Sequence, residues 1–216
     1  MSGGLRSQAA VGVVPPRLIA ACRVIFASQN GRTALAAMAI SQATMVAVMT
    51  MTPVHLKAHG HEGVSPLVIS LHIAGMYAFS PLIGRFCDKR GRFRAITIGS
   101  CLLVVASVLA ALAGDAAVLI FPALWLLGIG WSFGLIGGSS LLVDSVPTDA
   151  RVSVQGAADL MMSLCGGLAG FSSGFVRKAV GFHMLANFAA VLAISLVVVA
   201  TRALGREAKT AVAISS

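Results

Sequence analysis

Six apolar stretches, each long enough to cross a membrane as a helix, constrain the fold more than any other feature of this sequence. A hydrocarbon core about 30 Å thick needs about 20 apolar residues in helical form. Residues 33–56, 66–83, 95–113, 116–143, 152–176 and 183–201 meet this requirement. Backbone groups in lipid must pair within their own segment, and strand-type alternation is absent. The sequence therefore predicts an all-α integral membrane protein with six transmembrane helices.

The composition agrees with this fold class. Apolar residues make up 57% of the chain and charged residues 11%, with a mean hydropathy of +0.92. A soluble domain carries about 25% charged residues. The net charge of +9 does not indicate a nucleic-acid partner, because the basic residues lie in short gaps between apolar stretches. Four scattered cysteines (Cys22, Cys87, Cys101 and Cys165) predict reduced thiols without a disulfide or zinc site, and no cofactor is predicted.

The distribution of Lys and Arg predicts the orientation in a plasma membrane. With the amino terminus inside, all but three of the 16 basic residues lie on the cytoplasmic side, and the exceptions are Lys57, Arg177 and Lys178. This bias predicts that both termini are cytoplasmic. We expect a leader over residues 1–32, without a secretory signal, a transmembrane domain over 33–201 and a tail over 202–216. Residues 17–32 carry an apolar face at positions 18, 22 and 25, which suits an interfacial helix; a disordered leader is the alternative.

Polar side chains inside the apolar stretches are candidates for function, because burying them in lipid is costly. Gln42, His72, Trp131 and Asn187 are candidate cavity residues. Each also has a structural explanation: the amides can bond to neighbouring helices, His72 can be a neutral packed ring rather than a proton relay, and Trp131 can fill the core. Gln155 and Asp159 are one helical turn apart on one face of the fifth stretch. Asp159 is interpreted as a gate residue or as a partner of Arg151, with proton coupling as the alternative.

Glycines recur every fourth residue in two of the stretches: Gly130, Gly134 and Gly138, and then Gly166, Gly170 and Gly174. Each set predicts a helix-packing seam, and such seams also suit helices that slide. Pro81 and Pro122 are tolerated because neighbouring helices can bond to the freed carbonyls, and either can kink its helix. His55, His59 and His61 are expected in the first outer loop, but only Glu62 is a nearby carboxylate, and no metal site is predicted.

The gap between the second and third stretches, residues 84–94, holds five basic residues and Asp88. It is expected to be a cytoplasmic loop. Its pattern Gly84-x-x-x-Asp88-Lys89-x-Gly91-Arg92-x-Arg94 resembles the signature loop of the major facilitator superfamily, with Phe93 replacing one base. That loop joins the second and third helices of a six-helix half. Residues 48–53, 70–84, 127–142 and 154–159 also resemble the carboxy-terminal half of bacterial members, and enzyme motifs are absent.

The resemblance implies two inverted three-helix repeats, at about 33–113 and 116–201. It implies a secondary transporter that works by alternating access, is coupled to an ion such as a proton and carries a small molecule. Asp88 would accept backbone amides at a helix amino terminus, while Lys89 and Arg92 would meet carboxylates or carbonyls. Asp144, Asp149 and Arg151 are candidate members of this network.

Family members generally have twelve helices, and this sequence predicts six. We expect either that this chain pairs with a second copy or with a separate amino-terminal half, or that it is a truncated half. In the paired case, Asp88 would dock near residue 152 of the partner copy. A non-transporting membrane subunit is the alternative function. A membrane-embedded enzyme is disfavoured, since no nucleophile–base or metal set lies within the stretches.

Overall fold

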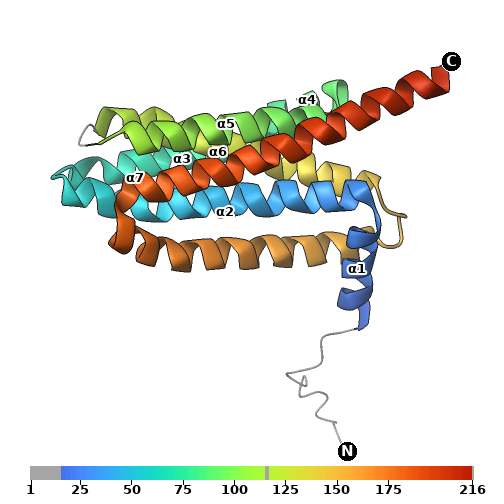
Figure 1. Cartoon of the computed structure of the whole chain (residues 1–216), viewed down its shortest axis with the longest axis horizontal. Coiled ribbons are helices and arrows are strands. Elements are labelled where there is room, and N and C mark those ends of the chain that lie inside the picture. The colour runs from blue at the N-terminus through green and yellow to red at the C-terminus, as the bar shows by residue number, and fades with distance from the viewer. Residues whose placement is uncertain (1–15, 115–116, 216) are drawn as a thin grey trace, which may run out of the picture.

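The computed structural model describes residues 16–114 and 117–215, and every regular element in these ranges is a helix (Figure 1). The predicted all-α class is therefore confirmed. The helices are α1 (Pro16–Ala27), α2 (Gln29–Ala58), the short 3₁₀ helix η1 (Glu62–Val64), α3 (Ser65–Tyr77), α4 (Ser80–Arg90), α5 (Arg92–Leu112), α6 (Ala117–Asp144) and α7 (Arg151–Ser215).

In the described residues, five helical stretches are long and apolar enough to cross a membrane. The last of them, in α7, provides two crossings. A straight helix of its 65 residues would be about 100 Å long, but α7 turns back on itself (Figure 1). The turn is at Gly181, whose φ of 85° and ψ of 170° are not helical. We call residues 151–180 the first limb of α7 and residues 182–215 the second limb. The second limb continues through residues 202–215, which we expected to be a tail.

The predicted second span is divided into α3 and α4. The interruption at residues 78–79 comes just before Pro81, which lies in the first turn of α4. Proline has no N–H to donate to the carbonyl of Tyr77, so a continuous helix would lose a hydrogen bond there. Pro122, in contrast, lies inside the unbroken helix α6.

Helix α1 crosses the end of the bundle at a steep angle to the other helices (Figure 1). Its expected apolar face does not point away from the protein. Ile25 is fully buried, and Leu18 and Cys22 pack against the same core cluster as residues of α2 and α7. Residues 29–32, which we had assigned to the leader, form the first turn of α2.

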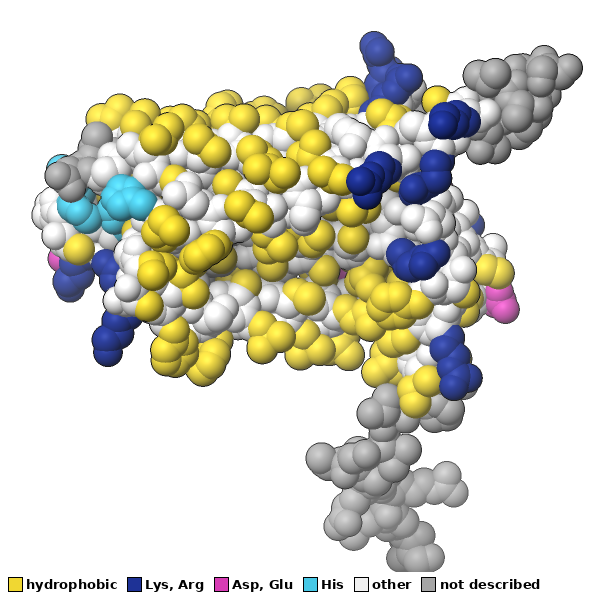
Figure 2. All heavy atoms as spheres, viewed as in Figure 1, with side chains coloured by type: hydrophobic (Ala, Val, Ile, Leu, Met, Phe, Trp, Pro, Cys, Tyr) yellow, Lys and Arg dark blue, Asp and Glu magenta, His cyan; other side chains and the backbone are white. Residues whose placement is uncertain are grey.

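The surface of the bundle is banded in a way that suits a bilayer. Figure 2 shows hydrophobic side chains over the middle of the visible face, with Lys and Arg gathered at its two ends. Phe171 and Phe175 on the first limb of α7, and Val191 on the second limb, are among the large apolar side chains that are more than 60% exposed. Lipid tails can cover such side chains, because bilayer tails are as apolar as leucine.

Candidate functional site

The signature segment 84–94 is not the loop that we expected. Residues 84–90 belong to α4, residues 92–94 begin α5, and only Gly91 separates the two helices. Gly91 has φ 95° and ψ 152°, a conformation that is essentially restricted to glycine. The second glycine of the signature therefore makes the turn, and the charged residues are held on two rigid helix ends.

This geometry predicts different effects for the two glycines of the signature. Gly91→Ala is expected to lower the free energy of unfolding by about 1–3 kcal/mol, because alanine is strained at this φ and ψ. Gly84→Ala is the matched control: Gly84 is helical, and a Cβ there meets no atom within 4 Å. The control should be neutral or stabilise the helix by up to about 1 kcal/mol. Thermal unfolding of both variants in detergent measures the difference, and equal midpoints would contradict the assigned role of Gly91.

Arg92 joins the two ends of this turn to the end of α6. One of its terminal nitrogens donates to Asp88 Oδ1 at 2.7 Å, and its Nε donates to Asp144 Oδ2 at 3.1 Å. The Arg92 side chain is only 24% exposed, whereas both carboxylates are more than half exposed. Arg92 and Asp144, two candidate members of the expected network, are thus in contact. The side-chain hydrogen bond found for Asp88 is to Arg92 of the same signature rather than to the backbone amides of a helix start.

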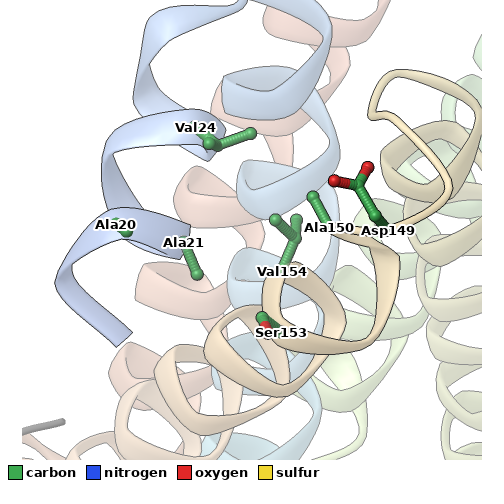
Figure 3. A pocket seen from close by; sticks show the side chains of 7 residues that line it. All are labelled: Ala20, Ala21, Val24, Asp149, Ala150, Ser153 and Val154. Atoms are coloured by element: carbon green, nitrogen blue, oxygen red, sulfur yellow. The ribbon is translucent and has the colours of Figure 1, made fainter. Parts of the chain in front are cut away.

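The other members of the expected network lie apart from this bridge. Lys89 and Arg94 are exposed on α4 and α5. Asp149 is exposed in the turn before α7, where it borders a pocket of about 350 Å³ beneath α1 (Figure 3). Arg151 begins α7, and its Nε is buried without a hydrogen-bond partner among the described residues.

Gln155 and Asp159 form a short polar chain on the first limb of α7. Gln155 Nε2 donates to Asp159 Oδ1 at 2.8 Å. Ser139 of α6 donates to Gln155 Oε1 at 3.1 Å. Ser139 was missed from the sequence, because a small hydroxyl in an apolar stretch usually bonds to its own helix. The chain ties Asp159 to α6 through Gln155, and the structure gives no ion pair between Asp159 and Arg151 in the described residues.

Gln42 and Trp131 meet in the middle of the bundle. Trp131 Nε1 donates to Gln42 Oε1 at 2.6 Å, which joins α6 to α2. A Cβ on Gly166, in the first limb of α7, would lie 2.8 Å from Gln42 Cγ. The ring of Tyr77, at the end of α3, lies edge-on to Trp131 with centroids 6.1 Å apart. Residues of four helices therefore converge here. Tyr77, which is the one tyrosine of the sequence, was not among our candidates.

The other two candidate cavity residues lie elsewhere. His72 is fully buried between α3 and α6, and its Nδ1 is 2.8 Å from the carbonyl oxygen of Leu124. A carbonyl only accepts, so Nδ1 carries the proton, and Nε2 has no hydrogen-bond partner among the described residues. Asn187 is exposed on the second limb of α7, where its amide contacts the sulfur of Met184 at 4.0 Å.

The two glycine sets do not each face a single neighbour. In α6, a Cβ on Gly130 would meet Gly99 and Leu103 of α5, whereas Gly134 and Gly138 face Ser41 and Met38 of α2. In α7, Gly166 and Gly170 face Gln42 and Val46 of α2, and Gly174 has open space. The glycines bring α6 close to both α2 and α5, and they bring the first limb of α7 onto α2.

Comparison with known proteins places this arrangement in a family. The family model described as Major Facilitator Superfamily matches residues 7–170. The chain belongs to the major facilitator superfamily. The resemblance drawn from the signature is thereby confirmed, and Arg92, Asp88 and Asp144 are the charged contacts of that signature in this member.

Three curated proteins that resemble this chain are transporters by name. An uncharacterized MFS-type transporter of Bacillus subtilis strain 168, YdeG, is 40% identical over 78% of this chain and 40% of its own length. A second one from the same strain, YddS, is 44% identical over 74% of this chain and 37% of its own length. The riboflavin transporter RfnT of Brucella anthropi is 31% identical over 70% of this chain and 38% of its own length. The alignments thus span about two fifths of each relative, and no solved structure matches the chain.

The histidines expected in an outer loop lie at the end of the bundle opposite Arg92. His55 is inside α2 and is buried, which differs from our expectation, and its ring lies beside His59 and His183. In the described residues, no group of three His, Cys, Asp or Glu side chains is arranged to hold a metal ion.

Proposed function

We propose that this chain is one six-helix half of a secondary transporter that moves a small molecule across the cytoplasmic membrane by alternating access. It requires a second half, which a second copy, a separate chain or a longer form of the same chain would supply. Membership of the major facilitator superfamily and relatives that are named as transporters support this proposal. The alignments cover about two fifths of those relatives, which suits a half that shares its pathway with a partner.

The observation that carries the proposal is the position of Arg92. It connects the turn between α4 and α5 with the end of α6, and so connects the first three crossings with the last three. Its two partners are more than half exposed. Such ion pairs contribute about 0–1 kcal/mol each to stability, so the bridge can break and form again as the helices move. We propose that Arg92 latches the cytoplasmic end.

The pathway is proposed to pass the place where Gln42, Trp131 and Tyr77 converge. Tyr77 is 60% exposed and can contact a substrate ring, while the Gln42 amide offers hydrogen bonds. One relative is named a riboflavin transporter, so riboflavin is the first substrate to test. Asp159 lies about two helical turns before Gly166, the α7 residue that faces Gln42. Asp159 is the proposed site of proton coupling or gating.

The sidedness is part of the same proposal. The Arg92 end holds most of the basic residues, and the cytoplasmic side of membrane proteins is enriched in Lys and Arg. Both termini would then be cytoplasmic.

Arg92→Gln tests the latch. We expect transport to fall at least about fivefold, the lower end of a 1–3 kcal/mol coupling, while membrane insertion stays intact. Arg90→Gln is the matched control, because Arg90 is an exposed base one residue before the turn and forms no side-chain hydrogen bond or ion pair with another described residue. The measurement is riboflavin uptake by proteoliposomes with and without an inward proton gradient.

The oligomeric state is measured on the same preparations by blue-native sizing and cross-linking. Dimers with uptake that depends on the proton gradient support the two-half proposal. Monomers without uptake of riboflavin or of a wider metabolite panel contradict pairing with a second copy and favour a separately supplied half or a non-transporting subunit. Equal uptake by both arginine variants contradicts the latch.

A further inference from the structure

A basic pocket lies at the end of the bundle opposite Arg92. Its volume is about 390 Å³, and it is formed by the end of α2 and the turn of α7 at Gly181. His55 and Phe182 form an aromatic wall, stacked with ring centroids 4.3 Å apart and an interplanar angle of 17°. Figure 2 shows histidines gathered at this end of the visible face, near Lys and Arg side chains.

Three histidine rings of the pocket each contact a backbone carbonyl. His55 Nε2 is 2.9 Å from the Gly114 oxygen, and His59 Nδ1 is 2.8 Å from the His55 oxygen. His183 Nδ1 is 2.6 Å from the Ala111 oxygen. Because a carbonyl can only accept, each of these ring nitrogens carries a proton. These carbonyl contacts fix the orientation of the rings at the wall of the pocket.

Two permanent cations complete the lining. Arg177 and Lys178 border the pocket, and among the described residues no carboxylate forms an ion pair with either of them. Arg177 Nε is buried and has no hydrogen-bond partner among the described residues. A terminal nitrogen of Arg177 donates to the Val54 oxygen over a long distance of 3.4 Å. The third base at this end, Lys57, differs because it pairs with Glu62 at 3.2 Å.

We propose that this pocket binds an oxyanion, that is, a phosphate or carboxylate group of a small molecule or of a lipid. A guanidinium with unused donors is the protein group best matched to the two oxygens of such an anion. The pocket volume lies within the usual range for small-molecule sites, which leaves room for the rest of the ligand against the ring of Phe182. Among the described residues this end of the bundle holds three basic side chains, and the two without a carboxylate partner both border the pocket.

The test uses the full chain in dodecyl maltoside micelles, which contain no phosphate. Inorganic phosphate is titrated against sodium chloride of equal ionic strength, and the thermal unfolding midpoint is followed. A ligand that binds only the folded state stabilises it by RT ln(1 + L/Kd), where L is the free ligand concentration, so the midpoint rises with the logarithm of the ligand concentration above Kd. In a second arm, phosphatidylglycerol is added and its adducts are counted by native mass spectrometry. The two arms distinguish a free anion from a lipid headgroup.

The variants are Arg177→Gln, Lys178→Gln and the charge-preserving Arg177→Lys, with Lys57→Gln as the control outside the pocket. For Arg177→Gln and Lys178→Gln, we expect at least a tenfold weaker apparent affinity for phosphate or at least tenfold fewer lipid adducts. We expect an intermediate effect for Arg177→Lys and no change for Lys57→Gln. Lack of binding by the wild-type chain in both arms would overturn the proposal, and so would equal binding by folded Arg177→Gln.

Asp115 needs its own variant, because it lies outside the described residues and directly follows Gly114, whose carbonyl contacts His55. If the wild-type chain binds neither ligand and Asp115→Asn binds phosphate, the cations are neutralised by the protein itself and the proposal fails. Binding by the wild-type chain at an affinity within twofold of that of Asp115→Asn supports it.

Discussion

Gly128→Ala is expected to be among the most destabilising single-methyl changes in this bundle. A Cβ at this position of α6 would overlap the backbone oxygen of His72 and lie 3.0 Å from the backbone nitrogen of Met76. Backbone atoms inside α3 cannot rotate away as a side chain can, so α3 and α6 must separate. Overpacking of this kind typically costs about 1–3 kcal/mol, and the separation also lengthens the bond between His72 and the Leu124 carbonyl.

Gly174→Ala is the matched control for this prediction. Both glycines are helical, but a Cβ on Gly174 meets no atom within 4 Å. Alanine is the better helix former by about 1 kcal/mol, so Gly174→Ala should raise the thermal midpoint slightly or leave it unchanged. Thermal unfolding followed by size-exclusion chromatography in detergent compares the two. Equal midpoints for the variants would show that α3 and α6 are not in close backbone contact.

The sequence could predict the crossings because lipid imposes a length and an apolar composition that each helix must satisfy. The predicted span 33–56 lies within α2, and the span 116–143 differs from α6 by one residue at each end. The span 95–113 begins three residues after the start of α5 and ends one residue beyond it. The break before Pro81 could also be predicted, since the missing N–H acts locally. The signature segment was mistaken for a loop because it is rich in charge. Lys and Arg are good helix formers, so a helix can continue through them, and only Gly91 is nonhelical.

The glycine sets show why helix partners could not be predicted. Four residues turn a helix by about 400°, so each repeat of four moves the face by about 40°. Over two repeats the shift is large enough to reach another neighbour. Gly130 accordingly faces α5 while Gly138 faces α2, and Gly174 has lost the contact with α2 that Gly166 makes. A spacing of four predicts close packing without identifying the helix that is packed against.

The candidate site was predictable residue by residue but not as a constellation. Gln42 and Trp131 stand out as polar groups in apolar stretches, yet they are 89 residues apart, and only the packing of α2 on α6 brings them together. Arg92 and Asp144 are 52 residues apart, and the signature helped here because it marks one bundle end. The partnership of Ser139 with Gln155 had no local signal.

The bond between Trp131 and Gln42 predicts a measurable coupling between the two side chains. Gln42→Leu keeps the shape of the side chain beside Gly166 but leaves the indole N–H of Trp131 without its acceptor. A buried donor left unpaired costs about 1–3 kcal/mol, although hydrogen bonds between helices in membranes have measured at about 0.6 kcal/mol on average, with a maximum of about 1.7. We therefore expect a loss of about 1–2 kcal/mol, near the overlap of these ranges.

A double-mutant cycle separates the bond from the packing. Trp131→Phe removes the donor, and in the combination Gln42→Leu with Trp131→Phe neither partner is left unpaired. The double variant should be less destabilised than the sum of the single variants, because the penalty for the orphaned indole N–H disappears. Unfolding of the four proteins in the same detergent gives the coupling energy. Strict additivity would show that the 2.6 Å contact contributes nothing to the stability of the α2–α6 interface, and Gln42 would then be free to bind substrate in place of the indole.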